Sequence, residues 1–500
     1  MRKLFLFITV IFLCSVRAIA IEDCGCEHHH HSTKNVEIKK GSILDVRDCI
    51  AIGVKNSPVI KEFAHRLEIA KSNVGIAKSA YFPEFGVGAG YRQEFNSNSI
   101  DYARNYRELP AVGVALNKMI WDFGRTTANV KMEEFLKIAA EYEFEDTVCK
   151  TVFNIKLAYY NLLKEIAYEQ ALKTNLELQQ ELIKEIKKLV ASGKKNNADL
   201  INAQVELLKI KAELVKSGAE CKNSQENLSN AIYLKNAPDY SIYDTQSFIY
   251  SPAGQKTFKN VYLSKTPKIA NDDTIFQYPD FTYNKAVEIA YNNSPDIKAL
   301  VAVRNSFEQA LISVKKSYYP SLNAGVGYDF VNSNLFSNNG LNVAVTIDAS
   351  INAMKQKYDV KSAKSQLALA DTEIETFKDD LYFTVRKCLN DVKASHDNLA
   401  VYKDKMVAAA ENFDLTFNNY KSDKMNQLEL EHSREEYFNS LKDYINSQFD
   451  YNISLIKLEM AMHEHLIDYH DDAEHAADFH EGDESDTLSK LIKCNKKHKP

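Results

Sequence analysis

Residues 81–91 and 318–328 of this chain carry the same pattern of tyrosine, proline, glycine and apolar residues. Pro83 aligns with Pro320, and the residues around them follow without a gap. Within each copy, apolar residues alternate with glycine or a polar residue, which is the period of a β-strand with one apolar face. The repeat therefore predicts one architecture built twice, each time around a short amphipathic strand.

The sequence before each strand predicts an interrupted helix. The tripeptide Asn-Ser-Pro occurs at 56–58 and again at 293–295. Serine is a good helix N-cap and proline is accepted at the first helical position. We therefore expect a helix over about 44–80 to stop and restart at this tripeptide, and the same in the second half.

A return strand follows each first strand, so each half contains a predicted β-hairpin. Apolar residues alternate again near 110–121, and the hairpins are expected over 84–121 and 321–351. The separation between equivalent residues falls from 237 (Pro83 to Pro320) to 230 (Ser192 to Ser422). The second hairpin therefore has the shorter loop, where a change of length is well tolerated.

Very long helices follow the hairpins. Residues 126–191 contain neither proline nor glycine, and a continuous helix of this length would approach 100 Å at ~1.5 Å per residue. After a break at 192–197, apolar residues recur at three- and four-residue spacing, which is typical of a coiled coil. We therefore expect one long antiparallel coiled-coil helical hairpin with a polar turn in each repeat.

The N-terminus has the pattern of an export signal. Arg2 and Lys3 precede an apolar stretch at 4–16, and Ala18-Ile19-Ala20 is a small-x-small cleavage site. An uncleaved anchor is the alternative. The expected organisation is a signal peptide (1–20), a segment with Cys and His (21–42), the first repeat (43–235), an inter-repeat segment (236–281), the second repeat (282–465) and an acidic, His-rich tail (466–500).

The strands predict a pore shared between chains. No later stretch reaches the ~18 apolar residues of a membrane helix, and the four strands of one chain cannot close a barrel. An open sheet edge in lipid leaves backbone groups unpaired, so several copies must complete the wall as a dimer or a trimer. A hairpin in a soluble protein is the alternative. The residues expected to face lipid are Phe85, Val87, Tyr91, Leu322, Val326 and Tyr328.

The net charge and the absence of several sequence motifs argue against some classes of function. The net charge of −6 is mild and mixed in sign, which gives no reason to expect nucleic acid. The chain has no glycine-rich phosphate loop after a strand, no His-Glu-x-x-His and no Gly-x-Ser-x-Gly, so we expect neither an enzyme nor a cofactor. The competing function is a periplasmic or secreted coiled-coil structural protein without a pore, soluble without detergent.

Both ends of the chain carry groups that bind transition metals, because dense thiols and imidazoles suit zinc, copper or nickel. A flexible polar N-terminus and a solvated tail are the alternatives. The candidate ligands are Cys24, Cys26, His28, His29, His30, His31, His465, His470, His475 and His480.

The Asn-Ser-Pro and Tyr-x-Pro patterns of both halves, with Ile120-Trp121-Asp122-Phe123-Gly124-Arg125, resemble the TolC-like outer membrane efflux protein family. The hexapeptide is similar to that family's turn from a strand into a long helix. The second half departs from it at 351–355. The resemblance covers about 43–235 and 281–465.

The resemblance implies a homotrimer whose twelve strands form one β-barrel in the outer membrane of a Gram-negative-type cell. Its helices would form a tunnel through the periplasm. Such a channel contacts outer membrane lipid, a periplasmic adaptor and an inner-membrane transporter, and it serves tripartite efflux or type I secretion. Drug, metal and protein cargo all remain open.

The resemblance also places a constriction just after each helical turn. The matching residues include carboxylates that would bind cations, and His432 would add pH sensitivity; an ordinary exposed helix face is the alternative. The expected constriction residues are Asp199, Asn202, Glu429, Glu431 and His432. Gly193, Lys194, Lys195, Asp423 and Lys424 in the turns are candidate adaptor contacts, or else simply solvated.

Overall fold

Each Asn-Ser-Pro tripeptide ends one helix and begins the next in the computed structural model, which describes residues 43–95, 106–235, 240–242, 278–279, 282–332, 337–349, 352–464 and 466. The buried hydroxyl of Ser57 accepts a hydrogen bond from the Ile60 amide at 3.2 Å. Ser294 does the same for Ile297 at 3.3 Å. The expected restart is thus present in both halves, between α2 (Val46–Asn56) and α3 (Pro58–Ser79) and between α8 (Tyr283–Asn293) and α9 (Pro295–Lys316).

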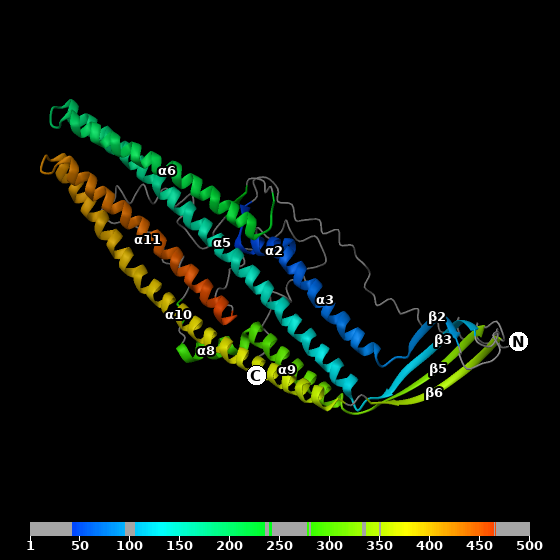
Figure 1. The fold of residues 1–500 in the computed structure, drawn as a ribbon. Coiled ribbons are helices and arrows are strands. Elements are labelled where there is room, and N and C mark those ends of the chain that lie inside the picture. The colour runs from blue at the N-terminus through cyan, green and yellow to red at the C-terminus, as the bar shows by residue number, and fades with distance from the viewer. Residues whose placement is uncertain are drawn as a thin grey trace.

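Four long helices form the body of the molecule (Figure 1). They are α5 (Arg125–Ala191), α6 (Asn197–Ala231), α10 (Ala353–Lys421) and α11 (Gln427–Met462). At ~1.5 Å per residue, the 67 residues of α5 span about 100 Å. The turns that join α5 to α6 and α10 to α11 lie together at one end of the molecule (Figure 1).

The two halves begin their long helices differently. At α5 the Asp122 carboxylate accepts hydrogen bonds from the Thr126 amide and hydroxyl, both at 2.6 Å, and from the Gly124 amide at 3.0 Å. Gly124 takes a positive φ of 83°, which glycine adopts without strain. At α10 the Asn352 side chain caps the Lys355 amide at 3.0 Å. Both long helices therefore have a defined start although the hexapeptide occurs once.

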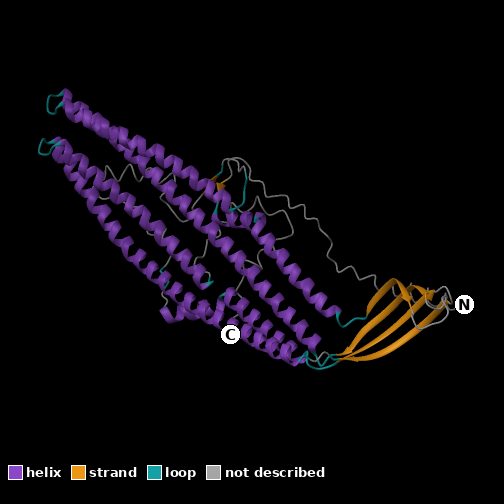
Figure 2. Ribbon diagram, viewed as in Figure 1, coloured by secondary structure: helices purple, strands orange, loops and turns teal. Residues whose placement is uncertain are grey.

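Four antiparallel strands form one sheet at the other end of the molecule (Figure 2). Their order is β2-β3-β5-β6, so the two hairpins lie side by side. The strands are β2 (Glu84–Phe95), β3 (Tyr106–Trp121), β5 (Ser321–Asn332) and β6 (Ser337–Asp348). A further parallel pair, β1 (Ile43–Leu44) with β4 (Ser241–Ile242), lies beside α2.

The core follows the helices along the molecule. Helix α5 is central and packs against α3, α6, α9 and α11. Tyr159 of α5 and Tyr451 of α11 are fully buried in the core. Between the same helices, Lys156 Nζ lies 2.6 Å from Glu459 Oε1 in a buried ion pair that joins the two repeats.

Within the described ranges, none of the helices combines the length and the apolar character that crossing a membrane requires.

Candidate functional sites: the sheet faces and the helix turns

One face of the sheet is apolar across all four strands. Directly opposed residues of an antiparallel pair lie on the same face. The register places Phe85, Leu116, Val326 and Val343 in one row, from β2 to β6. These side chains are exposed, from 44% at Leu116 to 70% at Val343. A second row contains Val87, Val114, Tyr328 and Leu341.

The opposite face carries small and polar residues. Asn342 of β6 donates a hydrogen bond to Asp329 of β5 at 2.7 Å. On β3, a Cβ at Gly113 would lie 2.3 Å from Asp329 Oδ1, so the absence of a side chain there makes room for the carboxylate. The sheet is therefore two-sided, with apolar residues on one face and glycine, asparagine and aspartate on the other.

The residues predicted to face lipid lie on exposed strand surface. Phe85, Val87, Tyr91, Val326 and Tyr328 are exposed by 45% to 69%. Leu322 is partly covered and lies opposite Ile347 of β6.

The two helical turns contact each other through Lys195. Its Nζ lies 2.6 Å from Asp423 Oδ1 and donates a hydrogen bond to the Met425 carbonyl at 3.2 Å. The same ammonium lies 4.4 Å from the centre of the Tyr420 ring. The Lys195 side chain is only 9% exposed, so this predicted adaptor contact is occupied within the chain. The other predicted turn residues, Gly193, Lys194, Asp423 and Lys424, are exposed.

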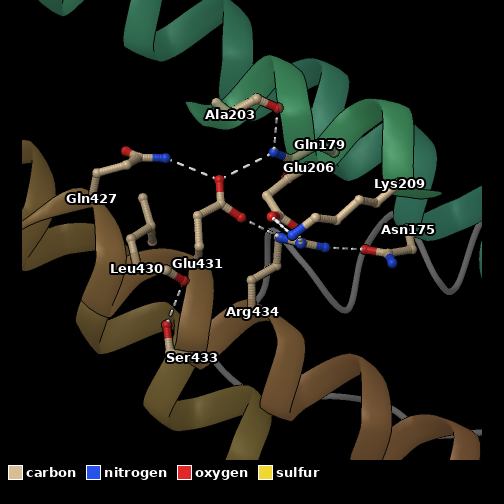
Figure 3. Close-up of polar contacts among 10 residues, drawn as sticks. All are labelled: Asn175, Gln179, Ala203, Glu206, Lys209, Gln427, Leu430, Glu431, Ser433 and Arg434. Carbon is tan, nitrogen blue, oxygen red and sulfur yellow. Dashed lines mark hydrogen bonds and ion pairs between the residues drawn. The ribbon is translucent and has the colours of Figure 1, made fainter. Parts of the chain in front are cut away.

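One helical turn beyond this contact, Glu431 joins the second hairpin to the first (Figure 3). Its Oε1 accepts hydrogen bonds from Gln427 of its own helix at 2.9 Å and from Gln179 of α5 at 3.1 Å. Gln179 also donates to the Ala203 carbonyl of α6 at 3.0 Å. Glu431 thus contacts the first hairpin at the point where α5 and α6 are linked.

Arg434 extends this link. Its Nε donates to Glu431 Oε2 at 2.8 Å, and its guanidinium also reaches Asn175 of α5 at 2.9 Å and Glu206 of α6 at 3.7 Å. The Arg434 side chain is 5% exposed, so a fully charged group is buried between the hairpins and is paired there. Six residues make up this link, and we call them the inter-hairpin network: Asn175, Gln179, Glu206, Gln427, Glu431 and Arg434 (Figure 3).

The structure gives the predicted constriction residues different roles. Glu429 forms a capping box with Asn426, in which each side chain bonds the other residue's amide, at 2.8 and 3.0 Å. Burial, followed by the nearby Asp199 carboxylate, raises the pKa of the Tyr420 phenol, so Asp199 of α6 lies beside the second hairpin. Asn202 and His432 are both exposed.

Sequence reasoning missed Gln179 and Arg434, which hold Glu431. The three-residue spacing of Glu431 and Arg434 does indicate one helix face. The partners on α5 and α6, however, depend on how the two hairpins pack. The predicted terminal metal ligands lie outside the described residues; they are Cys24, Cys26, His28, His29, His30, His31, His465, His470, His475 and His480.

Comparison with known proteins supports the reading of the sheet and the helices. The model of the outer membrane efflux protein family matches residues 54–232 and 286–462. The outer membrane efflux protein BepC of Brucella suis is 22% identical over 360 residues, which are 71% of each chain. The alkaline protease secretion protein AprF of Pseudomonas aeruginosa is 22% identical over 166 residues, which are 33% of this chain and 34% of AprF. The chain thus matches about a third of the length of AprF.

A solved structure of CusC, described as forming a transmembrane channel, has the same fold. It superposes with a TM-score of 0.70 at 14% identity, over 86% of this chain and 95% of that one. Because the family model matches both repeats and more than half of the residues, this chain belongs to the outer membrane efflux protein family.

Proposed function

We propose that this protein is the outer membrane channel of an export system, acting as a tripartite efflux or type I secretion component. Three copies would place their sheets in the outer membrane and their helices in the periplasm. Membership of the family supports this function, and the names of BepC and AprF, efflux and secretion, support the two kinds of system.

The observation that carries the proposal is the continuous apolar face of the four-stranded sheet. An exposed apolar surface of this extent is unfavourable in water and is suited to lipid. The described part of the sheet also ends at β2 and β6, each paired on one side only. Unpaired strand edges cannot remain open in lipid, so β2 of one copy would pair with β6 of the next.

The long helices would continue the pore into the periplasm and end at the turns. There, Asp199, Asn202, Glu429 and His432 would narrow the entrance, while the inter-hairpin network holds the two hairpins together. The exposed turn residues Gly193, Lys194, Asp423 and Lys424 would meet a periplasmic adaptor, which connects to an inner-membrane transporter.

Reconstitution tests the proposed function. The mature protein, purified in detergent, is expected to be a trimer and to conduct ions in planar lipid bilayers. A protein that is monodisperse as a monomer in buffer without detergent, and that gives no conductance, would instead be the coiled-coil structural protein.

A further inference from the structure

Three potential metal ligands from distant parts of the chain meet near the middle of the molecule. Asp146 belongs to α5, Asp296 is the second residue of α9, and His463 follows α11 directly. One ligand atom from each residue lies within 4.8 Å of the other two. We call these three residues the mid-rod cluster. Among the residues that the structure describes it is the one such group, and it lies where α9 begins and α11 ends.

Two atoms of the mid-rod cluster are buried without a hydrogen-bond partner. They are Oδ1 of Asp146 and Nδ1 of His463. The Asp146 side chain is only 7% exposed, and its carboxylate points into the cluster, because one of its oxygens is among the three clustered atoms. Buried polar atoms usually have partners, so two such atoms at one place leave contacts that a ligand would complete.

A cationic group already lies between the two carboxylates. The Nζ of Lys150 is 2.5 Å from Asp146 Oδ2 and 3.6 Å from Asp296 Oδ2. The electrostatic field of the cluster therefore favours a positive charge. The Lys150 side chain is 54% exposed, so an ammonium displaced from the cluster can reach solvent.

A cavity borders the cluster at Asp146. It has a volume of about 510 Å³ and is lined by residues that include Arg66, Glu143, Asp146 and Lys150. The cavity lets a hydrated ion approach Asp146 and gives the displaced ammonium space.

We propose that Asp146, Asp296 and His463 bind a divalent transition-metal cation, such as Zn²⁺, which replaces the ammonium of Lys150. Two carboxylate oxygens and one imidazole nitrogen are ordinary zinc ligands at about 2.0–2.2 Å, and water completes the coordination. Only a neutral imidazole binds a metal.

The bound cation would connect the two repeats. Asp146 lies in the first repeat, whereas Asp296 and His463 lie at the start of α9 and at the end of α11 in the second. The site would fix the end of α11 against α5 and α9.

Anomalous diffraction tests the site directly. Crystals of the full-length protein soaked in zinc chloride are expected to show a peak at the zinc absorption edge between Asp146, Asp296 and His463. Density for Lys150 should then be displaced. A map with zinc elsewhere in the protein, but with none at these three residues, would overturn the proposal.

Two variants with opposite expected effects complete the test. Lys150→Met removes the competing ammonium and is expected to tighten zinc binding about tenfold. Asp296→Asn removes a ligand charge and is expected to weaken it about tenfold. Melting temperatures are measured over a range of zinc concentrations, and the concentration that gives half of the full rise is compared between variants. Zinc bound at this site is expected to raise the melting temperature because its ligands come from three different helical segments.

Lys137→Met is the matched control, because Lys137 lies on the same helix and pairs with Glu141 at 3.1 Å, outside the cluster. Any zinc bound by the histidine-rich ends would affect all variants alike. If Lys150→Met and the control respond to zinc equally, the cluster is not a metal site.

Discussion

The ammonium of Lys195 lies 2.6 Å from the carboxylate of Asp423 and so joins the turn of one helical hairpin to the turn of the other. The two residues are not equivalent in the repeat. Lys195 aligns with Met425, and Asp423 aligns with Gly193. Gly193 and Asp423 share a left-handed conformation, with φ of 72° and 59°. The two turns thus share one backbone conformation but carry different side chains, and these side chains pair with each other.

Lys195→Met is expected to separate the two turns and to raise the single-channel conductance in planar bilayers. The effect on stability is expected to be small, up to about 1 kcal/mol, because Asp423 is 71% exposed and an ion pair in contact with solvent contributes little. Lys194→Met is the control, since it removes the same charge from an exposed neighbour. Equal conductance in the two variants would show that the contact does not hold the turns together.

Arg434→Met is expected to destabilise the protein by about 3–5 kcal/mol, because it leaves Glu431 buried without its cationic partner. The double variant Arg434→Met with Glu431→Leu is expected to recover much of the loss, since neither charge is then buried. Melting temperatures of the purified protein measure both effects. Arg386→Met removes an exposed arginine and serves as control. A double variant no more stable than the single one would contradict the role of the pair.

The repeats and their strands could be predicted because the alternation of apolar with small or polar residues marks a strand, whatever that strand packs against. The long helices could be predicted equally well, because α5 lacks proline and glycine throughout.

The start of β3 could not be predicted correctly from the sequence. We expected the strand to begin near residue 110, and it begins at Tyr106. Pro110 pairs with Tyr91 of β2, but the β5 partners of β3 begin at Ala111. The proline therefore lies where β3 has one neighbour, and its missing N–H interrupts no pairing with β5.

The contacts of the candidate site were harder to predict from the sequence than the fold. The sequence identified Glu431 as a residue near the turn, but not that Gln179, 252 positions earlier, would bond its carboxylate. Such partners depend on the relative rotation of two packed hairpins, which no local pattern encodes. The faces of the sheet, in contrast, follow from alternation alone.

Val343→Lys and Ala344→Lys place the same charge on opposite faces of β6. A lysine on the lipid face costs about 2–4 kcal/mol near the middle of a bilayer, whereas a lysine facing water costs little. We therefore expect Val343→Lys to reduce the amount of trimer recovered from outer membranes, and Ala344→Lys to leave it near the parental amount. Ala344 lies opposite Gly325 of β5, on the face that carries small and polar residues. Equal assembly of the two variants would contradict the assignment of the faces.

Alkaline pH is expected to destabilise the protein partly through Tyr437 of α11. Burial, followed by the carboxylate of Asp414, raises the pKa of Tyr437 to about 12, against about 10 for an unfolded tyrosine. Between these values the unfolded chain loses the phenolic proton and the folded chain keeps it. The contribution of Tyr437 to stability is therefore complete below pH 10 and is lost as the pH rises towards 12.

Tyr437→Phe removes this titration and keeps the ring, whose plane is parallel to that of Phe413 with centroids 6.2 Å apart. Between pH 9 and pH 11 the variant is expected to lose about 1 kcal/mol less stability than the parent, at roughly 1.4 kcal/mol per pKa unit. Melting temperatures at the two pH values give the comparison. Tyr358→Phe, at a tyrosine that is 56% exposed, is expected to behave like the parent. If Tyr437→Phe and Tyr358→Phe lose stability to the same extent, the phenol of Tyr437 is not held protonated by its surroundings.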